Sequence, residues 1–92
     1  MFAIGFDMVI ADLKQHYKGS YNNAYYDINM ELYKYGFFRT QGSVYLTESK
    51  DMANLFRAVS ALKQIGWFKN SVRDIRAFRV GDWSDFTAFI KE

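Results

Sequence analysis

The sequence predicts one ferredoxin-like domain of the α+β class, in which two helices lie on one face of an antiparallel sheet. Its element order would be βαββαβ, followed by a short C-terminal element. Three observations indicate this fold. The chain begins with a β-prone run, two stretches have helical periodicity, and two similar segments, Gly36–Arg39 and Gly66–Lys69, follow those helices and lead into β-prone residues. A chain of 92 residues fits a single domain, residues 1–92.

The first half is predicted to contain a strand, a helix and a second strand. The first strand is Phe2–Met8, and the second is Phe37–Thr40. Between them we expect a helix that begins at Ser20 as N-cap and ends before Gly36. Its apolar face recurs at spacings of three and four: Tyr21, Ala24, Tyr25, Ile28, Leu32 and Tyr35.

The second half repeats this order. Gln41-Gly42 would form a tight link or a bulge before a strand over Ser43–Leu46, and the last strand is Val72–Val80. The helix between them would be capped by Ser49, with Asp51 in its first turn, and would end at Gly66. Its expected apolar face consists of Met52, Leu55, Phe56, Val59 and Leu62, with Lys63 or Ile65. The tail over Trp83–Ile90 could form a short helix or an edge strand, and the helix, which Asp82 and Asp85 would cap, is the favoured prediction.

The composition indicates a self-associating intracellular protein. The chain has no cysteine, no signal peptide pattern and no long uncharged stretch, so we expect a soluble cytoplasmic protein with no membrane partner. Nine Phe, seven Tyr and two Trp exceed what so small a core can easily hide. Exposed aromatic surface usually faces a partner, and a symmetric homodimer is the most common one.

Asp7 lies near the end of the first apolar run. A carboxylate placed among large apolar side chains is costly unless a cation, a group of N–H donors or a metal ion compensates it. Each compensation would make a candidate site at a strand end. The alternative is an aspartate that only caps the neighbouring backbone. The residues themselves leave both interpretations open.

The remaining reactive residues exclude several mechanisms. The single histidine, His16, is expected in the loop after the first strand, so a pair of histidines cannot act as base and acid within one chain. No glycine-rich phosphate loop or dinucleotide motif is present. Four other aspartates, Asp12, Asp51, Asp82 and Asp85, have no metal-ligand spacing. One chain therefore offers one candidate carboxylate, whereas a homodimer would offer two copies of Asp7 that could share a Mg²⁺ ion.

Basic residues concentrate between Arg57 and Arg79. This segment holds six basic residues and one acid, a local net charge of +5, within a chain of net charge +2. Strand alternation would direct Arg73 and Arg79 to one face and Arg76 to the other. These arginines could contact phosphates, or they could form a solvated sheet edge.

Several stretches resemble the virulence-associated protein D family across almost the whole chain. They are Phe6-Asp7, Gln41–Tyr45, Trp67–Phe78 and Trp83–Thr87. That family is similar in turn to small CRISPR-associated proteins that form ferredoxin-like dimers. Those more distant relatives usually have a tyrosine where this chain has Phe6 and a glutamate where it has Leu46.

The resemblance implies a homodimeric endoribonuclease that cuts messenger RNA. In some members it acts as the toxin of a toxin–antitoxin pair, restrained by a small partner protein. By matching position, Asp7 would be the catalytic carboxylate, Ser43 its helper, and Gln41 and Tyr45 part of the RNA-binding motif.

The residues leave the chemistry open. Asp7 could hold a metal ion that activates water, or it could act as a base on the RNA 2′-hydroxyl. Exposed tyrosines, among them Tyr17, Tyr26 and Tyr33, could stack on unpaired bases, but packing in a dimer is the favoured use of each. The alternative function is a non-catalytic dimeric adaptor that binds nucleic acid or protein through the same basic sheet.

Overall fold

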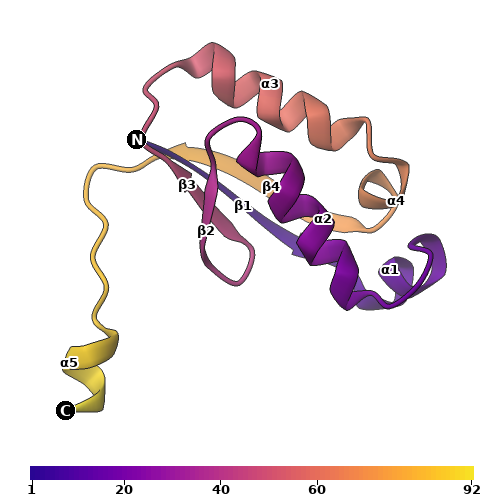
Figure 1. Ribbon diagram of the computed structural model, residues 1–92, viewed down its shortest axis with the longest axis horizontal. Helices are drawn as coiled ribbons and strands as arrows, with labels where there is room; N and C mark the ends of the chain where they lie inside the picture. Colours follow the sequence, from indigo (N-terminus) through magenta and orange to yellow (C-terminus); the bar gives the residue numbers. More distant parts are fainter.

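The computed structural model describes residues 1–92 and has the ferredoxin-like arrangement (Figure 1). Its four strands form one antiparallel sheet in the order β2-β3-β1-β4. The elements in chain order are β1 (Phe2–Met8), α1 (Ile10–His16), α2 (Asn22–Tyr33), β2 (Phe38–Gln41), β3 (Val44–Thr47), α3 (Met52–Lys63), α4 (Gly66–Lys69), β4 (Val72–Arg79) and α5 (Thr87–Lys91). The predicted strands are confirmed, with ends that differ by at most one residue.

The core lies between the sheet and the helices α2 and α3. Alternate residues of β1 face the helices, because successive side chains of a strand point to opposite faces. They pack with one stripe of each main helix, whose members recur every three or four residues. These core residues are Phe2, Ile4, Phe6 and Met8 from β1, Ala24, Ile28 and Leu32 from α2, and Leu55, Ala58 and Leu62 from α3.

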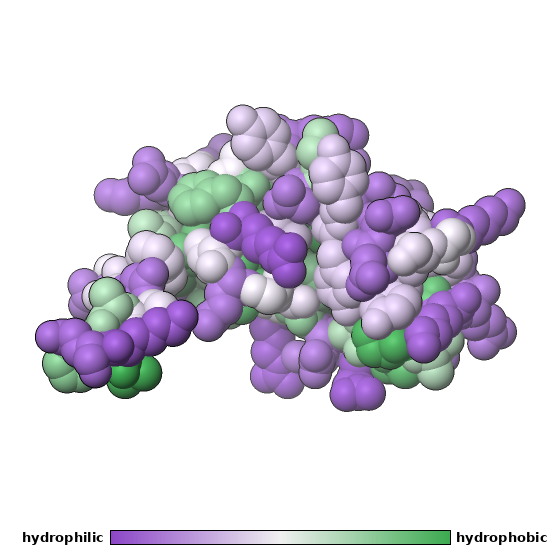
Figure 2. Space-filling model, turned by 60° about the horizontal axis from the view of Figure 1, so that its bottom comes forward, coloured by the Kyte–Doolittle hydropathy of each residue, from purple (hydrophilic) through white to green (hydrophobic).

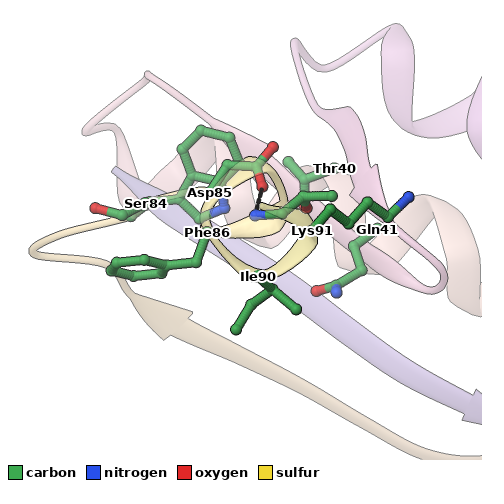
Figure 3. A pocket seen from close by; sticks show the side chains of 9 residues that line it. Thr40, Gln41, Ser84, Asp85, Phe86, Ile90 and Lys91 are labelled. Atoms are coloured by element: carbon green, nitrogen blue, oxygen red, sulfur yellow. Dashed lines mark hydrogen bonds between the residues drawn. The ribbon is translucent and has the colours of Figure 1, made fainter.

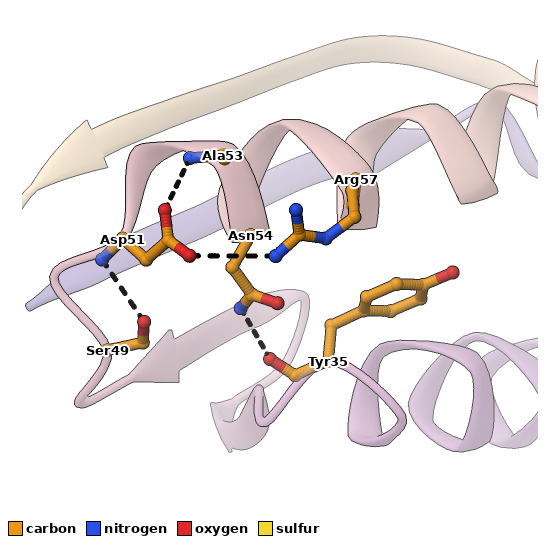
Figure 4. Close-up of polar contacts among 6 residues, drawn as sticks. All are labelled: Tyr35, Ser49, Asp51, Ala53, Asn54 and Arg57. Carbon is orange, nitrogen blue, oxygen red and sulfur yellow. Dashed lines mark hydrogen bonds and ion pairs between the residues drawn. The ribbon is translucent and has the colours of Figure 1, made fainter.

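The ends of α2 and α3 differ in part from the prediction. Gly36, with φ +79°, lets the chain turn out of α2 as expected. Ser20 does not cap α2, which begins at Asn22 without a side-chain cap. Ser49 does not cap α3 either. It accepts the N–H of Asp51, and Asp51 is the N-cap that accepts the N–H of Ala53 (Figure 4).

Two further expectations about α3 were wrong. The helix ends at Lys63, and Gly66 begins the separate short helix α4. Met52 and Phe56 are 58% and 72% exposed, because the stripe of Leu55, Ala58 and Leu62 already fills the contact with the sheet.

His16 also lies in a helix rather than a loop. It occupies the last turn of α1, which the fully buried Leu13 anchors to the core. The side chain of His16 is exposed. None of the helices is long and apolar enough to cross a membrane.

Residues 81–92, which we call the C-terminal arm, extend away from the domain (Figure 1). Every residue of the arm is exposed, including those of α5. The tail does form a helix, but only over Thr87–Lys91, with Phe86 at the N-cap position. The Asp85 carboxylate accepts the N–H of Thr87 as expected, whereas Asp82 makes no such bond. The radius of gyration is 14.1 Å, whereas a compact chain of this length would have about 12 Å. The arm therefore adds nothing to the core of its own chain.

Candidate functional site

Asp7 lies on the open face of the sheet, the face that no helix covers. Its neighbours in β1, Phe6 and Met8, point into the core, so Asp7 points the other way. Its side chain is 71% exposed. The expectation of a desolvated carboxylate among apolar side chains was therefore wrong, because alternation along the strand separates Asp7 from the core.

A second carboxylate lies directly opposite Asp7. Asp74 of β4 is its register partner across the antiparallel β1–β4 pair. Two like charges at such positions destabilise a sheet unless cations balance them. Arg76 donates to both carboxylate oxygens of Asp74, at 3.0 and 3.2 Å, and Arg73 lies 4.0 Å from Asp7. We call these four residues the charged quartet.

The quartet is an exposed, electrically balanced cluster. The hydrogen bonds and charge of Asp74 raise the pKa of the Arg76 guanidinium above its usual value, so Arg76 keeps its charge. Both ion pairs are solvent-accessible, and such pairs typically contribute about 0–1 kcal/mol. An incoming phosphate can therefore replace either carboxylate as the partner of its arginine at little cost.

A β-bulge brings Arg73 to the quartet. Asp7 pairs with Asp74 while the next residue, Met8, pairs with Val72, so Arg73 is an extra residue on β4. This changes the prediction that Arg73 and Arg79 share a face. Arg79 is the register partner of Phe2 on the helix side, and its guanidinium lies 5.5 Å from the centre of the Phe2 ring.

The quartet borders a shallow depression of about 280 Å³ on the open face. Gly5 and Phe78 line it together with Asp7, Asp74 and Arg76. Beyond Phe78 the open face becomes apolar. The register aligns four residues across all four strands, and we call them the apolar row: Phe38, Leu46, Ala3 and Phe78. Phe38 and Phe78 are exposed, whereas Leu46 and Ala3 are already buried. The open face thus has a charged end and an apolar end.

Ser43 lies close to Asp7 in the backbone but on the other face by alternation. Its carbonyl accepts the N–H of Phe6 at 3.2 Å, which places Ser43 opposite Phe6. No hydrogen bond joins the Ser43 hydroxyl to Asp7.

Gln41 is exposed at the β2–β3 turn, where Gly42 has φ +40° and the register shifts. The expected tight link and bulge are both present.

Tyr45, the other motif residue, is fully buried and stacks on Phe6 with 6.0 Å between ring centres. Burial raises the pKa of its hydroxyl. Tyr45 thus supports the strand that bears Asp7 from within the core.

The other sequence candidates are dispersed. Tyr17 donates to Asp27 at 2.6 Å and packs edge-on against Trp67, so its ring is already engaged. Tyr26 and Tyr33 are exposed on α2, in the helix layer and not on the open face. The basic segment does not form one patch either, because Lys63 and Lys69 lie beside a groove between α3 and β4.

Reasoning from sequence missed Asp74, although a signal was present. Asp7 lies near the end of the first predicted strand and Asp74 near the start of the last. Antiparallel pairing of those strands brings such positions together.

The two carboxylates fit a Mg²⁺ ion held mainly by water and substrate oxygens. No group of three or more His, Asp or Glu side chains converges anywhere in the structure.

Comparison with known proteins gives close relatives over nearly the full length. The chain is 58% identical over 91 residues to Endoribonuclease VapD of Dichelobacter nodosus, covering 99% of this chain and 98% of the relative. It is 60% identical over 84 residues to Endoribonuclease VapD 1 of Riemerella anatipestifer, covering 91% and 94%. It is 52% identical over 93 residues to Endoribonuclease VapD of Helicobacter pylori, covering 99% of each. A scan against protein-family models found no match.

Proposed function

The chain belongs to the VapD endoribonuclease family, and on that premise we propose that it cleaves messenger RNA as a homodimer in which Asp7 is the catalytic carboxylate. The observation that carries the proposal is the charged quartet. It combines exposed carboxylates, suited to proton transfer or cation binding, with guanidinium groups suited to phosphate. The non-catalytic adaptor is the weaker alternative, since the relatives are named endoribonucleases.

Substrate binding begins with exchange of partners in the quartet. A backbone phosphate of the RNA replaces Asp7 as the ion-pair partner of the Arg73 guanidinium, because the contact between Arg73 and Asp7 is long at 4.0 Å. Asp7 is then free to act next to that phosphate. Arg76 neutralises a second phosphate or the charge that develops during cleavage. Gln41, exposed at the β2–β3 turn, contacts the RNA beyond the quartet.

Asp7 acts in one of two ways. As a base, it takes the proton of a 2′-hydroxyl, the 2′-oxygen attacks the adjacent phosphorus, and the 5′-oxygen of the next nucleotide leaves with a proton from water. Alternatively, Asp7 and Asp74 would hold a Mg²⁺ ion, which when bound would supply an activated water. Ser43, the helper that the resemblance implies, lies on the other face of the sheet from Asp7, so we give its hydroxyl no role in either route.

The homodimer is proposed to form through the open face. When two sheets pack face to face about a twofold axis parallel to their strands, the β2 edge of one copy lies over the β4 edge of the other. The apolar rows then cover each other, with Phe38 against the partner's Phe78. The two quartets lie at the same end of the sandwich, where the two copies of Asp7 face each other.

A cleavage assay on the purified protein tests the catalytic proposal. Wild type and Asp7→Asn are compared on one RNA sequence and on its DNA counterpart, each with Mg²⁺ and with EDTA. Asn keeps the shape and removes the charge, so Asp7→Asn should abolish cleavage. If the protein cleaves the RNA but not the DNA in EDTA, the result supports the 2′-hydroxyl route. Cleavage that requires Mg²⁺ supports the metal route. Absence of cleavage by wild type under all four conditions would favour the adaptor.

We further propose that the enzyme is the toxin of a toxin–antitoxin pair, held in check by a small protein. Induced expression in bacteria should then arrest growth for wild type but not for Asp7→Asn at equal protein levels. Equal growth of both strains would contradict the toxin proposal and leave the cleavage assay unaffected.

A further inference from the structure

The guanidinium of Arg39 lies on the helix side of β2 and has no carboxylate partner. Arg39 is the register partner of Tyr45, which points into the core, so the two side chains share a face of the sheet. Its Nε donates to the carbonyl of Gly42 at 2.6 Å, which orients the guanidinium. None of the ion pairs includes Arg39, and its four other N–H groups make no hydrogen bond within the chain. An oriented guanidinium with free donors suits a phosphate.

Tyr25 of α2 lies close to this guanidinium. α2 packs on β2, and Tyr25, in the first turn of α2, is half-buried against the core. Burial is the main cause that raises the pKa of the Tyr25 hydroxyl, and the charge of Asp7 raises this pKa further. The charge of Arg39 acts in the opposite direction. The hydroxyl therefore lies within range of both charges, keeps its proton near neutral pH and can donate to a phosphate oxygen.

A second tyrosine and a lysine extend this arrangement toward α1. Tyr21 precedes Tyr25 by four residues, so the two side chains are neighbours on one face of the helix. The ammonium group of Lys14 lies 5.4 Å from the centre of the Tyr21 ring and forms no ion pair. Both rings are partly exposed. We call the four residues Lys14, Tyr21, Tyr25 and Arg39 the tyrosine strip, in which each of two rings has a cation nearby.

The tyrosine strip lies at the end of the sheet that bears Asp7. α1 follows β1 directly, and Figure 1 shows α1 and the start of α2 beside the end of β1. The carbonyl of Ser43 accepts the N–H of Phe6, so the β2–β3 turn also reaches toward this end. Face-to-face packing of two sheets would cover the open face but not the strip, which lies on the helix side. An RNA strand bound at the quartet can therefore reach the strip by passing round the end of the sheet.

The C-terminal arm is less suited to RNA. Figure 2 shows hydrophobic atoms at its protruding end. Its charged residues are mainly acidic and would repel phosphates. They are Asp82, Asp85 and Glu92, against the single cation Lys91. The arm and two residues of β2, Thr40 and Gln41, line a cavity of about 540 Å³ (Figure 3). Arg39, which faces the helices, does not line this cavity.

We propose that the tyrosine strip binds the RNA strand next to the cleavage site. Bases stack on its two rings, and backbone phosphates pair with its two cations. This inference rests on the proposed function and names the substrate class as single-stranded RNA, because a ring can stack only on a base that is free of a paired strand. The four residues are positioning residues, since they hold the strand while a phosphate lies at the quartet.

The first experiment measures binding of a labelled single strand of 2′-O-methyl RNA in EDTA, which neither cleavage route can cut, by fluorescence anisotropy. Arg39→Gln and Lys14→Gln should each weaken binding severalfold. Each should also reduce the slope of log binding constant against log salt concentration by about 0.7, the value for one phosphate contact of a single strand. The matched control is Lys34→Gln, which removes a charge that pairs with Glu31 at the far end of α2. Equal losses in the control and the strip variants, or no loss in the strip variants, would overturn the proposal.

The second experiment tests stacking. Tyr25→Leu should weaken binding of the single strand roughly 5- to 150-fold, the effect of one lost base stack, whereas Tyr25→Phe should keep most of the affinity because the ring remains. Both variants should bind a 2′-O-methyl duplex of the same sequence as wild type does. The matched control is Tyr33→Leu, a 70% exposed tyrosine on the same helix. A duplex affinity that falls as far as the single-strand affinity would refute stacking. Circular dichroism checks folding, and if Tyr25→Leu unfolds, the two exposed cations decide the outcome.

The third experiment separates the strip from the chemistry by single-turnover cleavage. Strip variants should raise the protein concentration that gives the half-maximal rate, and the maximal rate should stay within about twofold of wild type. A lower maximal rate at an unchanged half-maximal concentration would contradict a positioning role. If wild type binds RNA through the strip but cuts none, the proposed function fails and the strip stands. If wild type cuts RNA and the strip variants bind as wild type does, only the strip fails.

Discussion

The charged quartet predicts that Asp7→Asn separates activity from stability. Removing the Asp7 charge loses an ion pair with Arg73 whose partners are 71% and 63% exposed. Such a pair contributes about 0–1 kcal/mol. The same change relieves repulsion from Asp74, which at a directly opposed position is worth roughly 0.2–1 kcal/mol. The two effects have opposite signs, so the free energy of unfolding should change by less than about 1 kcal/mol.

The corresponding shift in melting temperature is less than about 4–8 °C for a domain of this size. RNA cleavage, by contrast, should fall by about 10²–10⁴, as expected when a general base or a catalytic cation ligand is removed. Melting is followed by circular dichroism, and cleavage by a fluorogenic RNA under single-turnover conditions. Glu48→Gln, which removes an exposed carboxylate outside the quartet, is the charge control.

Two results would refute this reasoning. Wild-type cleavage by Asp7→Asn would remove Asp7 from catalysis. A fall in melting temperature well beyond this range would show that Asp7 contributes to the fold through a contact stronger than the exposed pair with Arg73.

Three further outcomes are expected. Arg76→Ala should weaken RNA binding and reduce the slope of log binding constant against log salt concentration by about 1. Arg79→Ala should leave RNA binding intact and cost about 0.5–1 kcal/mol of stability, since its guanidinium covers the Phe2 ring on the helix side. Equal effects of the two variants on RNA binding in a fluorescence titration would contradict the separation of faces. Gly36→Ala should destabilise the domain by about 1–2 kcal/mol in urea unfolding, because φ +79° disfavours any residue with a Cβ, and an unchanged midpoint would count against it. The hydrogen bonds from Thr87 lower the pKa of Asp85. The support that Asp85 gives to α5 is therefore full above the unfolded pKa and is lost as the pH falls through the folded pKa. A protection factor against amide exchange at Thr87 that stays the same on acidification would argue against this cap.

The sequence predicted the strands well because alternation and turn residues are local signals. β1 was placed at its observed bounds, and Gly36 stopped α2 because only a positive φ fits there. Helix ends were predicted less well. Ser49 and Asp51 are both good caps, and only the observed hydrogen bonds show that Asp51 starts α3.

The site was predicted only in part, for a physical reason. Asp7 stands out in its own strand, but the meaning of Asp74 depends on pairing between segments that are far apart in sequence. The bulge at Arg73 is invisible locally, so strict alternation assigned this arginine to the wrong group. Registers and bulges are set by the contact between two strands, and a single strand does not encode them.

The bulge on β4 also changes what a one-residue deletion would do. In a regular strand, losing one codon reverses the face of every residue beyond it and exposes the core. Here Asp7 already pairs with Asp74 and Met8 with Val72, so deleting Arg73 would leave both pairs in place. Gain or loss of this guanidinium is therefore a single genetic step that leaves the register unchanged, and it allows the charge of the site to vary while the fold is retained.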